Sequence, residues 1–398
     1  MKRKGEVAIL LSTTLLVYTS PCFGDECCEQ PVCCECNPCC AFDPDCVDIR
    51  CYTPPYYNLS GDCGRSFQAE FLWWYAKENN LAYTLEVDAS LAATEMGLSY
   101  SPDEYEYLGT KFRPGLRIGS GWNSACDGWD GLATWTYTRN QKKDSTNTDF
   151  FFISDELPEF TALINPWTNP GFTFDGTPLI FDKMSAKWHL QFNQVDLEFG
   201  RKYWLSSAFT LRPYAGARAG WITTKFRVKA LRDFTLDPDT DPELITFKDT
   251  FSTKTLGAGI IGGFQPNWYI CNTFVFFANF QCALLWQRFN GSKKERYQAP
   301  ELEEPINYSN SFRSVFYTMQ TVWDLAAGFR WENTWCCDRF RTSLDVSWEQ
   351  HIWLDFDQRT TFSNRKSIGA NIYSFDHVDR ITTDLMLGGA VARFRLDF

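Results

Sequence analysis

Apolar and polar residues alternate with a period of two over much of the chain after residue 63. In the first such stretch, Phe67, Phe71 and Trp73 lie on one face, and Gln68 and Glu70 lie on the other. A period of two is the side-chain repeat of a β-strand. A tilted strand crosses a bilayer with about nine to eleven residues. Ten stretches are near or above that length, over residues 67–75, 112–122, 129–139, 186–200, 207–222, 254–265, 272–288, 314–332, 340–356 and 380–398.

The connections between these stretches alternate between two sizes. Short links with turn residues lie near 123–128, 201–206, 266–271 and 333–339. Long links lie near 77–111, 140–185, 223–253, 289–313 and 357–379. Bacterial outer-membrane barrels alternate short periplasmic turns and long extracellular loops in this way. We therefore predict an all-β fold, a transmembrane antiparallel β-barrel with an even number of strands, about ten within a range of about 8–16, and both termini in the periplasm.

The alternation assigns a lipid face and an interior face to each strand. In the stretch 340–356, Leu344, Val346, Trp348, Ile352 and Leu354 are predicted to face lipid, while Asp345, Ser347, Glu349 and His351 face inward, and Gln350 is an exception on the lipid face. The pattern slips by one position near Gln194. A β-bulge there would keep Asp196 and Glu198 inside.

Charged residues of both signs collect at the predicted inward positions. Such an interior suits a water-filled lumen, and it is tolerable in a filled one if the charges pair. The candidates for lining a pore are Glu70, Arg117, Asp130, Asp196, Glu198, Arg212, Arg218, Asp324, Arg330, Glu332, Asp345, Glu349, Arg393 and Arg395.

The composition supports a membrane barrel. Aromatic residues make up 17% of the chain, with 34 Phe, 17 Tyr and 16 Trp. Outer-membrane barrels place aromatic residues on the lipid face and in interfacial girdles. Beyond the N-terminal region, no apolar stretch approaches the roughly 18 residues of a membrane-spanning helix. The net charge of -11 argues against nucleic acid or an anionic membrane surface as a partner. The expected surroundings of the barrel are outer-membrane lipid.

The first 24 residues have the order of a secretory signal peptide. Basic residues at 2–4 precede an apolar run over 7–17, and Gly24 follows at the expected cleavage point. The run is too short for a comfortable membrane span. A lipoprotein would be cleaved before Cys22, but Pro21 stands where a small residue is expected.

Residues 25–64 form a cysteine-rich segment, which we predict to be a periplasmic extension. Its density favours a disulfide framework, since so short a segment cannot bury enough apolar surface to fold alone. The candidates are Cys27, Cys28, Cys33, Cys34, Cys36, Cys39, Cys40, Cys46, Cys51 and Cys63. Other cysteines are scattered, at Cys126, Cys271, Cys282, Cys336 and Cys337.

Cleavage after Gly24 removes one of the 16 cysteines, Cys22, and leaves 15. An odd number favours at least one bond to another molecule, either a second copy of the chain or another envelope protein. The alternatives are an intrachain framework with one free thiol, and a metal–thiolate site around Cys34 and Cys36. No histidine and no paired CxxC spacing supports the metal site. We expect no metal and no other cofactor.

The end of the chain resembles an assembly signal. Phe394, Leu396 and Phe398 alternate with Arg393, Arg395 and Asp397, and the chain stops on the aromatic residue. A terminal amphipathic strand ending in Phe is similar to the signal that the barrel assembly machinery recognises. That machinery is therefore an expected partner.

Three stretches carry a resemblance to a known family: Phe67-Gln68-Ala69-Glu70-Phe71-Leu72-Trp73-Trp74, the stretch from Trp188 to Gly200, and the stretch from Leu211 to Gly220. They resemble the Legionella major outer membrane protein-like, pore-forming family, which includes the MOMP-like proteins of environmental chlamydiae. The resemblance covers about 67–398 and implies an abundant, surface-exposed, porin-like pore. The cysteine block departs from the Legionella branch. It is similar to chlamydia-like envelopes, where disulfide cross-linking stands in for peptidoglycan strength.

The leading functional hypothesis is a porin that passes small hydrophilic solutes, with selectivity and ion transport set by the lumen charges. Ten strands are close to the size at which side chains fill a barrel, so extra strands in the loops, a narrow pore and a mainly structural barrel remain open. The loop 141–183 is long enough for a plug or a hairpin.

Two further hypotheses are a closed structural barrel or adhesin, and an outer-membrane hydrolase. The hydrolase would use His351, predicted near the outer end of its strand, or the last loop, with Asp376 and His377. We expect His189 to be a lumen residue or an interface anchor. Since no nucleophile–base–carboxylate set is apparent from spacing, we predict that the chain is not an enzyme.

The remaining motifs indicate wall packing and a solvated turn. Gly257, Gly259, Gly262 and Gly263 relieve crowding in the barrel wall. The acidic run at 237–243 lacks the glycine and terminal glutamate of a standard calcium loop, so a solvated turn is favoured.

Overall fold

The computed structural model describes residues 64–79, 81–92, 97–123, 129–148, 159–167, 173–174, 177–178, 180–206, 208–233, 244–271, 273–299, 306–335, 340–366 and 374–398. Ten long strands form the wall of a closed antiparallel barrel, as predicted. They are β1 (Arg65–Glu78), β4 (Phe112–Asn123), β5 (Trp129–Asn147), β10 (Lys183–Arg201), β12 (Phe209–Asp233), β13 (Leu244–Tyr269), β14 (Phe274–Ala299), β15 (Ile306–Trp335), β16 (Phe340–Lys366) and β17 (Ser374–Asp397).

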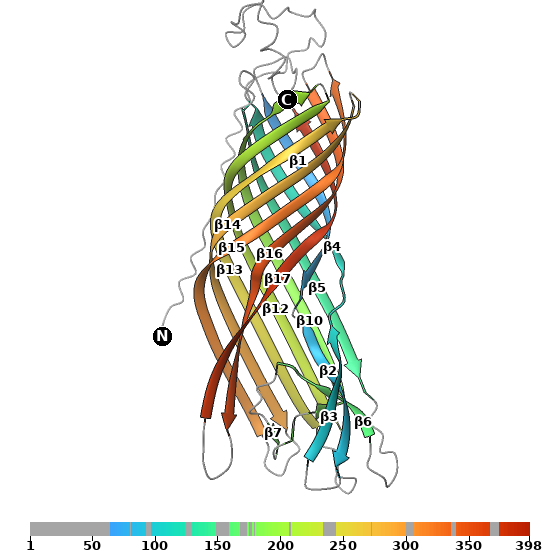
Figure 1. The fold of residues 1–398 in the computed structure, drawn as a ribbon, viewed down its shortest axis with the longest axis vertical. Helices are drawn as coiled ribbons and strands as arrows, with labels where there is room; N and C mark the ends of the chain where they lie inside the picture. The colour runs from blue at the N-terminus through green and yellow to red at the C-terminus, as the bar shows by residue number, and fades with distance from the viewer. Residues whose placement is uncertain are drawn as a thin grey trace, which may run out of the picture.

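The barrel closes between its first and last strands. β1 pairs with β17 over the register Ser66↔Asp397 to Glu78↔Leu385. β10 pairs directly with β12, and the short β11 (Tyr203–Ser206) lies between them in the sequence. Arg65 and Phe398 exchange backbone hydrogen bonds of 2.8 and 2.9 Å. Both ends of the barrel chain therefore lie at one end of the cylinder, which we call the terminal end (top in Figure 1).

The opposite end, which we call the loop end, carries additional strands. β2 (Ala82–Ala92), β3 (Gly97–Tyr107), β6 (Glu159–Ile164) and β9 (Ile180–Phe181) form a four-stranded sheet, and β7 (Thr173–Phe174) pairs with β8 (Thr177–Pro178). Figure 1 shows β2, β3 and β6 beside the loop end of β5 and β10. The described residues include no helix long and apolar enough to cross a membrane.

Exposed apolar side chains form a belt around the terminal half of the barrel. On β12 the outward positions from Phe209 to Trp221 are apolar, and on β14 the outward positions from Phe274 to Trp286 are apolar. Trp286 is 58% exposed. Each run is a little longer than the about nine to eleven residues needed to cross a bilayer at a tilt. The predicted apolar outward face of these strands is confirmed.

The strands continue well beyond this belt, and here the predicted loop boundaries are wrong. The links predicted at 223–253, 289–313 and 357–379 are largely strand, so that β12 runs to Asp233, β13 begins at Leu244 and β17 begins at Ser374. Past the belt, the outward positions become polar and the inward positions become apolar. This inversion removes the signal of a lipid-facing strand, although the backbone pairing continues unchanged.

The predicted β-bulge near Gln194 is wrong for the same reason. β10 pairs with β5 and with β12 without a register shift. Its inward face is continuous and changes from Trp188 and Phe192 to Asp196 as the strand enters the belt. An irregularity lies instead on β16, where the register shifts between Trp353 and Asp357.

Gln350, the predicted polar exception on the lipid face, has a partner. The hydroxyl of Tyr75 donates to Gln350 Oε1 at 2.9 Å. The two side chains meet across Gly388 of the intervening β17, where a Cβ would lie 2.3 Å from Gln350 Oε1. Glycine is therefore required at this position for the contact, which satisfies an amide that hydrocarbon could not.

Candidate functional site

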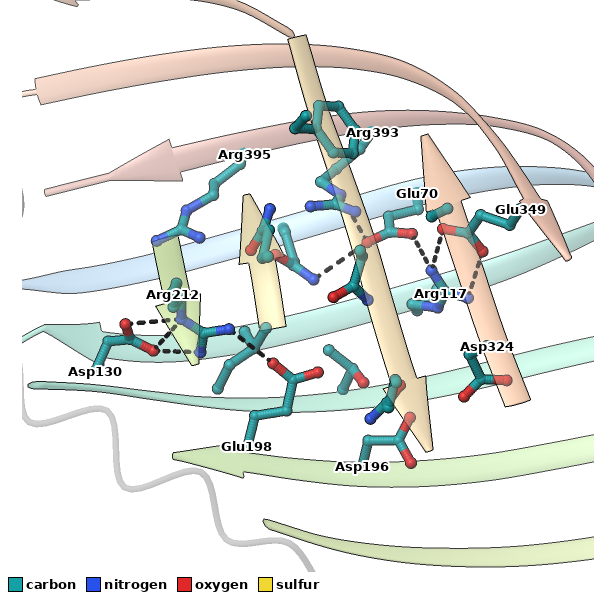
Figure 2. A pocket seen from close by; sticks show the side chains of 18 of the residues that line it. Glu70, Arg117, Asp130, Asp196, Glu198, Arg212, Asp324, Glu349, Arg393 and Arg395 are labelled. Carbon is teal, nitrogen blue, oxygen red and sulfur yellow. Dashed lines mark hydrogen bonds and ion pairs between the residues drawn. The ribbon is translucent and has the colours of Figure 1, made fainter. Parts of the chain in front are cut away.

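The interior of the terminal half is lined by charged side chains. Each of the pore-lining candidates lies on the inward face of its strand, at the depth of the apolar belt. Whether they line a conducting pore stays a prediction. Most of them line one cavity of about 110 Å³ with a largely polar wall. Figure 2 shows this cavity from close by.

Arg117 of β4 joins three strands. It donates to Glu70 of β1 at 2.6 Å and, through both terminal nitrogens, to Glu349 of β16 at 3.0 and 2.9 Å (Figure 2). A guanidinium fork suits such two-point contacts with carboxylates. On the other side of Glu70, Arg393 of β17 approaches at 2.9 Å.

Asp345 extends this network toward the terminal end. Arg330 of β15 donates to both Asp345 oxygens, at 3.0 and 3.1 Å. Arg393 also lies 3.4 Å from Asp345. Adjacent wall strands are therefore cross-linked through the lumen, in addition to their backbone pairing.

His351 connects two carboxylates. Its Nδ1 lies 2.6 Å from Asp324 and its Nε2 lies 3.2 Å from Glu349. Because both ring nitrogens face carboxylates, the doubly protonated imidazolium fits this position. Asp324 also contacts Arg218 at 2.6 Å, and Arg218 contacts Asp196 at 2.7 Å.

Arg212 is the centre of a second cluster, which lies nearer the terminal end (lower left in Figure 2). Its Nε lies 2.9 and 2.8 Å from the two oxygens of Asp130, and Nη1 lies 3.1 Å from Glu198. The guanidinium stacks over Tyr214 at 5.0 Å, and the Tyr214 hydroxyl donates to Asn279 at 2.9 Å.

Near the terminal end, three further contacts between side chains line the lumen. Arg341 pairs with Glu332, and Arg395 donates to Asp397 at 2.8 Å. The ammonium group of Lys202 donates to the Tyr269 hydroxyl at 2.7 Å.

An apolar layer fills the lumen where the wall leaves the belt. Trp74, Trp188 and Trp353 are among its largest members, and all are at most 2% exposed. Phe192 meets Trp353 edge-on with the ring centroids 5.7 Å apart. The layer continues toward the loop end through inward side chains of β12 to β14, including Phe226 and Phe251.

A segment of the long link after β6 enters the lumen from the loop end. Trp167 is 4% exposed, and its ring lies 6.1 Å from Phe226 and 5.2 Å from Phe251. Its Nε1 donates to the carbonyl of Ala82 at 2.6 Å. We call residues 165–167 the plug segment. For the loop 141–183, the sequence allows a plug or a hairpin; the described part holds the short paired strands β6 to β9, with residues 165–167 inside the lumen.

Two wall residues hold the plug segment by polar contacts. Asn165 donates to Asp249 of β13 at 2.9 Å, and Lys293 of β14 donates to the carbonyl of Trp167 at 2.8 Å. Burial raises the pKa of Asp249 to about 7, and nearby Lys293 opposes that rise. Asp249 therefore changes charge near neutral pH.

Several other sequence expectations need correction. His189 faces outward and lies beyond the belt toward the loop end, so the lumen placement is wrong, and its role as an interface anchor stays a prediction. His351 lies near the middle of β16, away from the strand end. Asp376 and His377 belong to β17 and not to a loop.

The candidate set missed some lumen groups and includes some residues outside the described part. The lumen is also lined by Lys202, Gln194, Gln281 and Tyr214. Three of these residues are neutral and Lys202 lies beside a turn, so the search for inward charges on strands did not find them. The cysteines from Cys27 to Cys63, and Cys126, Cys336 and Cys337, lie outside the described residues. Cys271 and Cys282 are free thiols.

Comparison with known proteins gives one family and several distant barrels. Residues 64–397 match the sequence model of the family described as Legionella pneumophila major outer membrane protein precursor. No curated protein matches the chain.

Among solved structures, the toluene transporter TodX of Pseudomonas putida is 9% identical, with 85% of this chain and 91% of that chain covered and a TM-score of 0.25. A FadL homologue of Pseudomonas aeruginosa is 6% identical, with coverages of 84% and 90% and a TM-score of 0.22. OmpT of Vibrio cholerae is 7% identical, with coverages of 82% and 99% and a TM-score of 0.15. At such TM-scores these similarities carry no argument about function.

Proposed function

Since the chain belongs to the family of the Legionella pneumophila major outer membrane protein, we propose that it is a narrow outer-membrane channel for ions and small hydrophilic solutes, closed in this conformation. Its path is the charged lumen of the terminal half, and its gate is the plug segment with the apolar layer. The terminal end is periplasmic, and the loop end faces the outside of the cell. No catalytic step is part of the proposal.

The charged lining at membrane depth carries this proposal. A barrel that serves only as a wall could fill the same space with apolar side chains, which is often neutral or stabilising relative to buried ion pairs. Ionisable residues within a membrane protein typically mark the pathway of an ion or polar solute. Here Arg117, Arg218 and Arg212 face carboxylates around a polar cavity of about 110 Å³, where a small hydrophilic solute would meet both signs of charge.

The gate follows from the contrast between the two halves of the lumen. Charged and hydrated species do not cross a layer of buried Trp and Phe side chains without its displacement. The plug segment is joined to the wall by the polar contacts of Asn165 and Trp167 with Asp249 and Lys293. Withdrawal of this segment would remove Trp167 from the layer and admit water from the loop end.

A second candidate function is a closed structural barrel. The observation that favours it is the apolar layer itself, because Trp74, Trp188 and Trp353 are almost fully buried. Their packing resembles a protein core more than a solvated channel. In this case the cysteine-rich segment would tie the barrel to other envelope molecules, and non-reducing gels of envelopes would show multimers that disappear on reduction.

Ion current through planar bilayers separates the two functions. The folded, full-length protein is expected to give small, discrete current steps, with long closed periods. Cation-to-anion selectivity should change when Glu349→Gln removes one lumen charge, while Asp233→Asn at the exposed tip of β12 serves as a control. A folded and inserted protein that passes no current at any applied voltage would refute the channel.

A further inference from the structure

The outer surface of the barrel wall carries a dense group of cations just beyond the lipid-facing belt. They project outward from β5, β10, β12, β13 and β14, and all are exposed except Lys225, which is half-buried. We call this group the cationic wall; its members are Lys143, Lys187, Lys225, Arg227, Lys229, Lys248, Lys254, Arg288, Lys294 and Arg296.

Cross-strand pairing places like charges directly opposite one another. Lys187 pairs with Lys143 on one side and with Arg227 on the other. Lys248 likewise pairs with Lys229 and with Arg296. Side chains at directly opposed positions have Cβ atoms about 4.5–5.5 Å apart, and like charges there are destabilising. Two such rows of three in one wall are an electrostatic cost that a bound polyanion would remove.

Carboxylates do not offset these charges within the described part of the wall. The remaining outward positions of these strand segments are mostly Ser, Thr, Asn and Gln, with Asp233 at the tip of β12 as the one acidic residue. None of Lys187, Arg227 and Lys248 has an ion-pair partner among the described residues. Burial lowers the pKa of Lys225, and the nearby charges of Arg227, Lys294 and Lys248 lower it further.

The position of the cationic wall along the barrel is the level at which membrane headgroups are expected. Arg288 is the next outward residue after the belt residue Trp286, so the cations begin where the hydrocarbon ends. From Lys254 to Lys248 the outward face of β13 extends six residues further from the belt, which is about 20 Å along the strand. The phosphates of a phospholipid leaflet lie in one plane, whereas a glycolipid with phosphorylated sugars presents anions at several heights.

We propose that the cationic wall binds the phosphorylated headgroup of an outer-leaflet glycolipid. The rows centred on Lys187 and Lys248 supply ammonium and guanidinium donors to phosphate oxygens, and neighbouring Ser and Thr hydroxyls contact the sugars. The binding site is the outside of the barrel, separate from the lumen. The inference rests on the outward orientation of the loop end, but not on channel activity.

Binding of diphosphoryl lipid A to the purified full-length protein in detergent tests the proposal. The variant carries Lys187→Gln, Arg227→Gln and Lys248→Gln. Its matched control carries Lys77→Gln, Lys111→Gln and Arg113→Gln. These three exposed cations lie in β1, directly before β4 and in β4. The affinity of the wall variant for lipid A should fall at least about tenfold, because three charge-assisted contacts are lost. The control should stay within about twofold of the wild type.

Two further measurements keep the test decisive. Lipid A without phosphates should bind the wild type as weakly as diphosphoryl lipid A binds the wall variant. Without lipid A, the wall variant should resist heat unfolding at least as well as the wild type, since like charges have been removed. Equal lipid A binding by the wall variant and the wild type would overturn the proposal. So would phosphatidylglycerol binding as tightly as lipid A, because a single-plane phosphate would then suffice.

Discussion

At the scale of single residues, four arginines of the membrane-depth lumen each contact two carboxylates: Arg117, Arg212, Arg218 and Arg393. Arg218 contacts both Asp196 and Asp324 and is almost fully buried. Removing one member of a buried charge network leaves its partners desolvated and unpaired, which costs far more than the pair contributes. These arginines therefore determine whether the terminal half of the barrel is stable.

Arg218→Gln should lower the free energy of unfolding by about 3–5 kcal/mol, because two buried carboxylates lose their counter-charge. The measurement is denaturant unfolding in lipid vesicles. Arg139→Gln, at an exposed outward position of β5, is the matched control and should change the free energy by less than about 0.5 kcal/mol. A cost below about 1 kcal/mol for Arg218→Gln would show that water or another cation compensates the carboxylates.

Asp249 makes the plug segment sensitive to pH. Its pKa is about 7 in the folded protein, above the ordinary value of an aspartate. The protonated form therefore favours the folded arrangement, a contribution that is complete below pH of about 4 and is lost as the pH rises through about 7. Backbone amides of residues 161–167 should exchange hydrogen more slowly at pH 5 than at pH 8, after correction for intrinsic rates.

Asp249→Asn is the control for this pH effect. The amide cannot ionise, and it retains an oxygen that can accept from Asn165. Protection of the plug segment in this variant should be nearly equal at the two pH values. If the variant keeps the full pH dependence of the wild type, another group is responsible.

At the scale of elements, β10 shows what alternation predicts and what it misses. Its backbone pairing is uniform, but its inward face changes from Asp196 to Phe192 and Trp188, while Lys187 faces out. The sequence therefore predicts the strand and its inward carboxylates correctly, but it gives the wrong phase before Gln194, where Trp188 and Phe192 face inward. The pattern imitates a bulge because a strand that leaves the membrane exchanges the polarity of its two faces.

Contacts between distant segments could not be predicted from local patterns. Trp167 lies in a proline-containing link, and nothing near it in the sequence indicates that Ala82, Asp249 and Lys293 surround it. The inward arginines could be found from alternation. Their partners could not, because these depend on strand register and on contacts across the lumen between strands that are not neighbours. Arg117 and Glu349, for example, are on strands that are not neighbours.

The plug segment is expected to control conductance. Trp167→Ala removes the side chain that packs on Phe226 and Phe251, and should raise the fraction of time spent open in planar bilayers at least several-fold. Trp286→Ala, on the lipid face, is the matched control and should leave the gating unchanged. Equal open fractions in wild type and Trp167→Ala would mean that the apolar layer closes the lumen without this segment.

At the scale of the whole molecule, the two halves of one cylinder have opposite polarity. Its terminal half has an apolar exterior and a charged interior, and its loop half has a polar, cationic exterior and an apolar interior. The even strand number and the closure could be predicted from the sequence, whereas three of the five predicted long links are largely part of the wall strands. The length of the loop half could not be predicted, because the outward face of this half lacks the apolar pattern of a lipid-facing strand.

The most direct test of this arrangement is the cost of an arginine at two outward positions of one strand. Both Ile260, which is 66% exposed in the belt, and Thr246, in the loop half, lie on the outward face of β13. In lipid vesicles, Ile260→Arg should lower the free energy of unfolding by about 2–4 kcal/mol, and Thr246→Arg should change it by no more than about 1 kcal/mol. Equal costs at the two positions, or a larger cost at Thr246, would contradict the placement of the membrane and with it the assignment of lumen, gate and cationic wall.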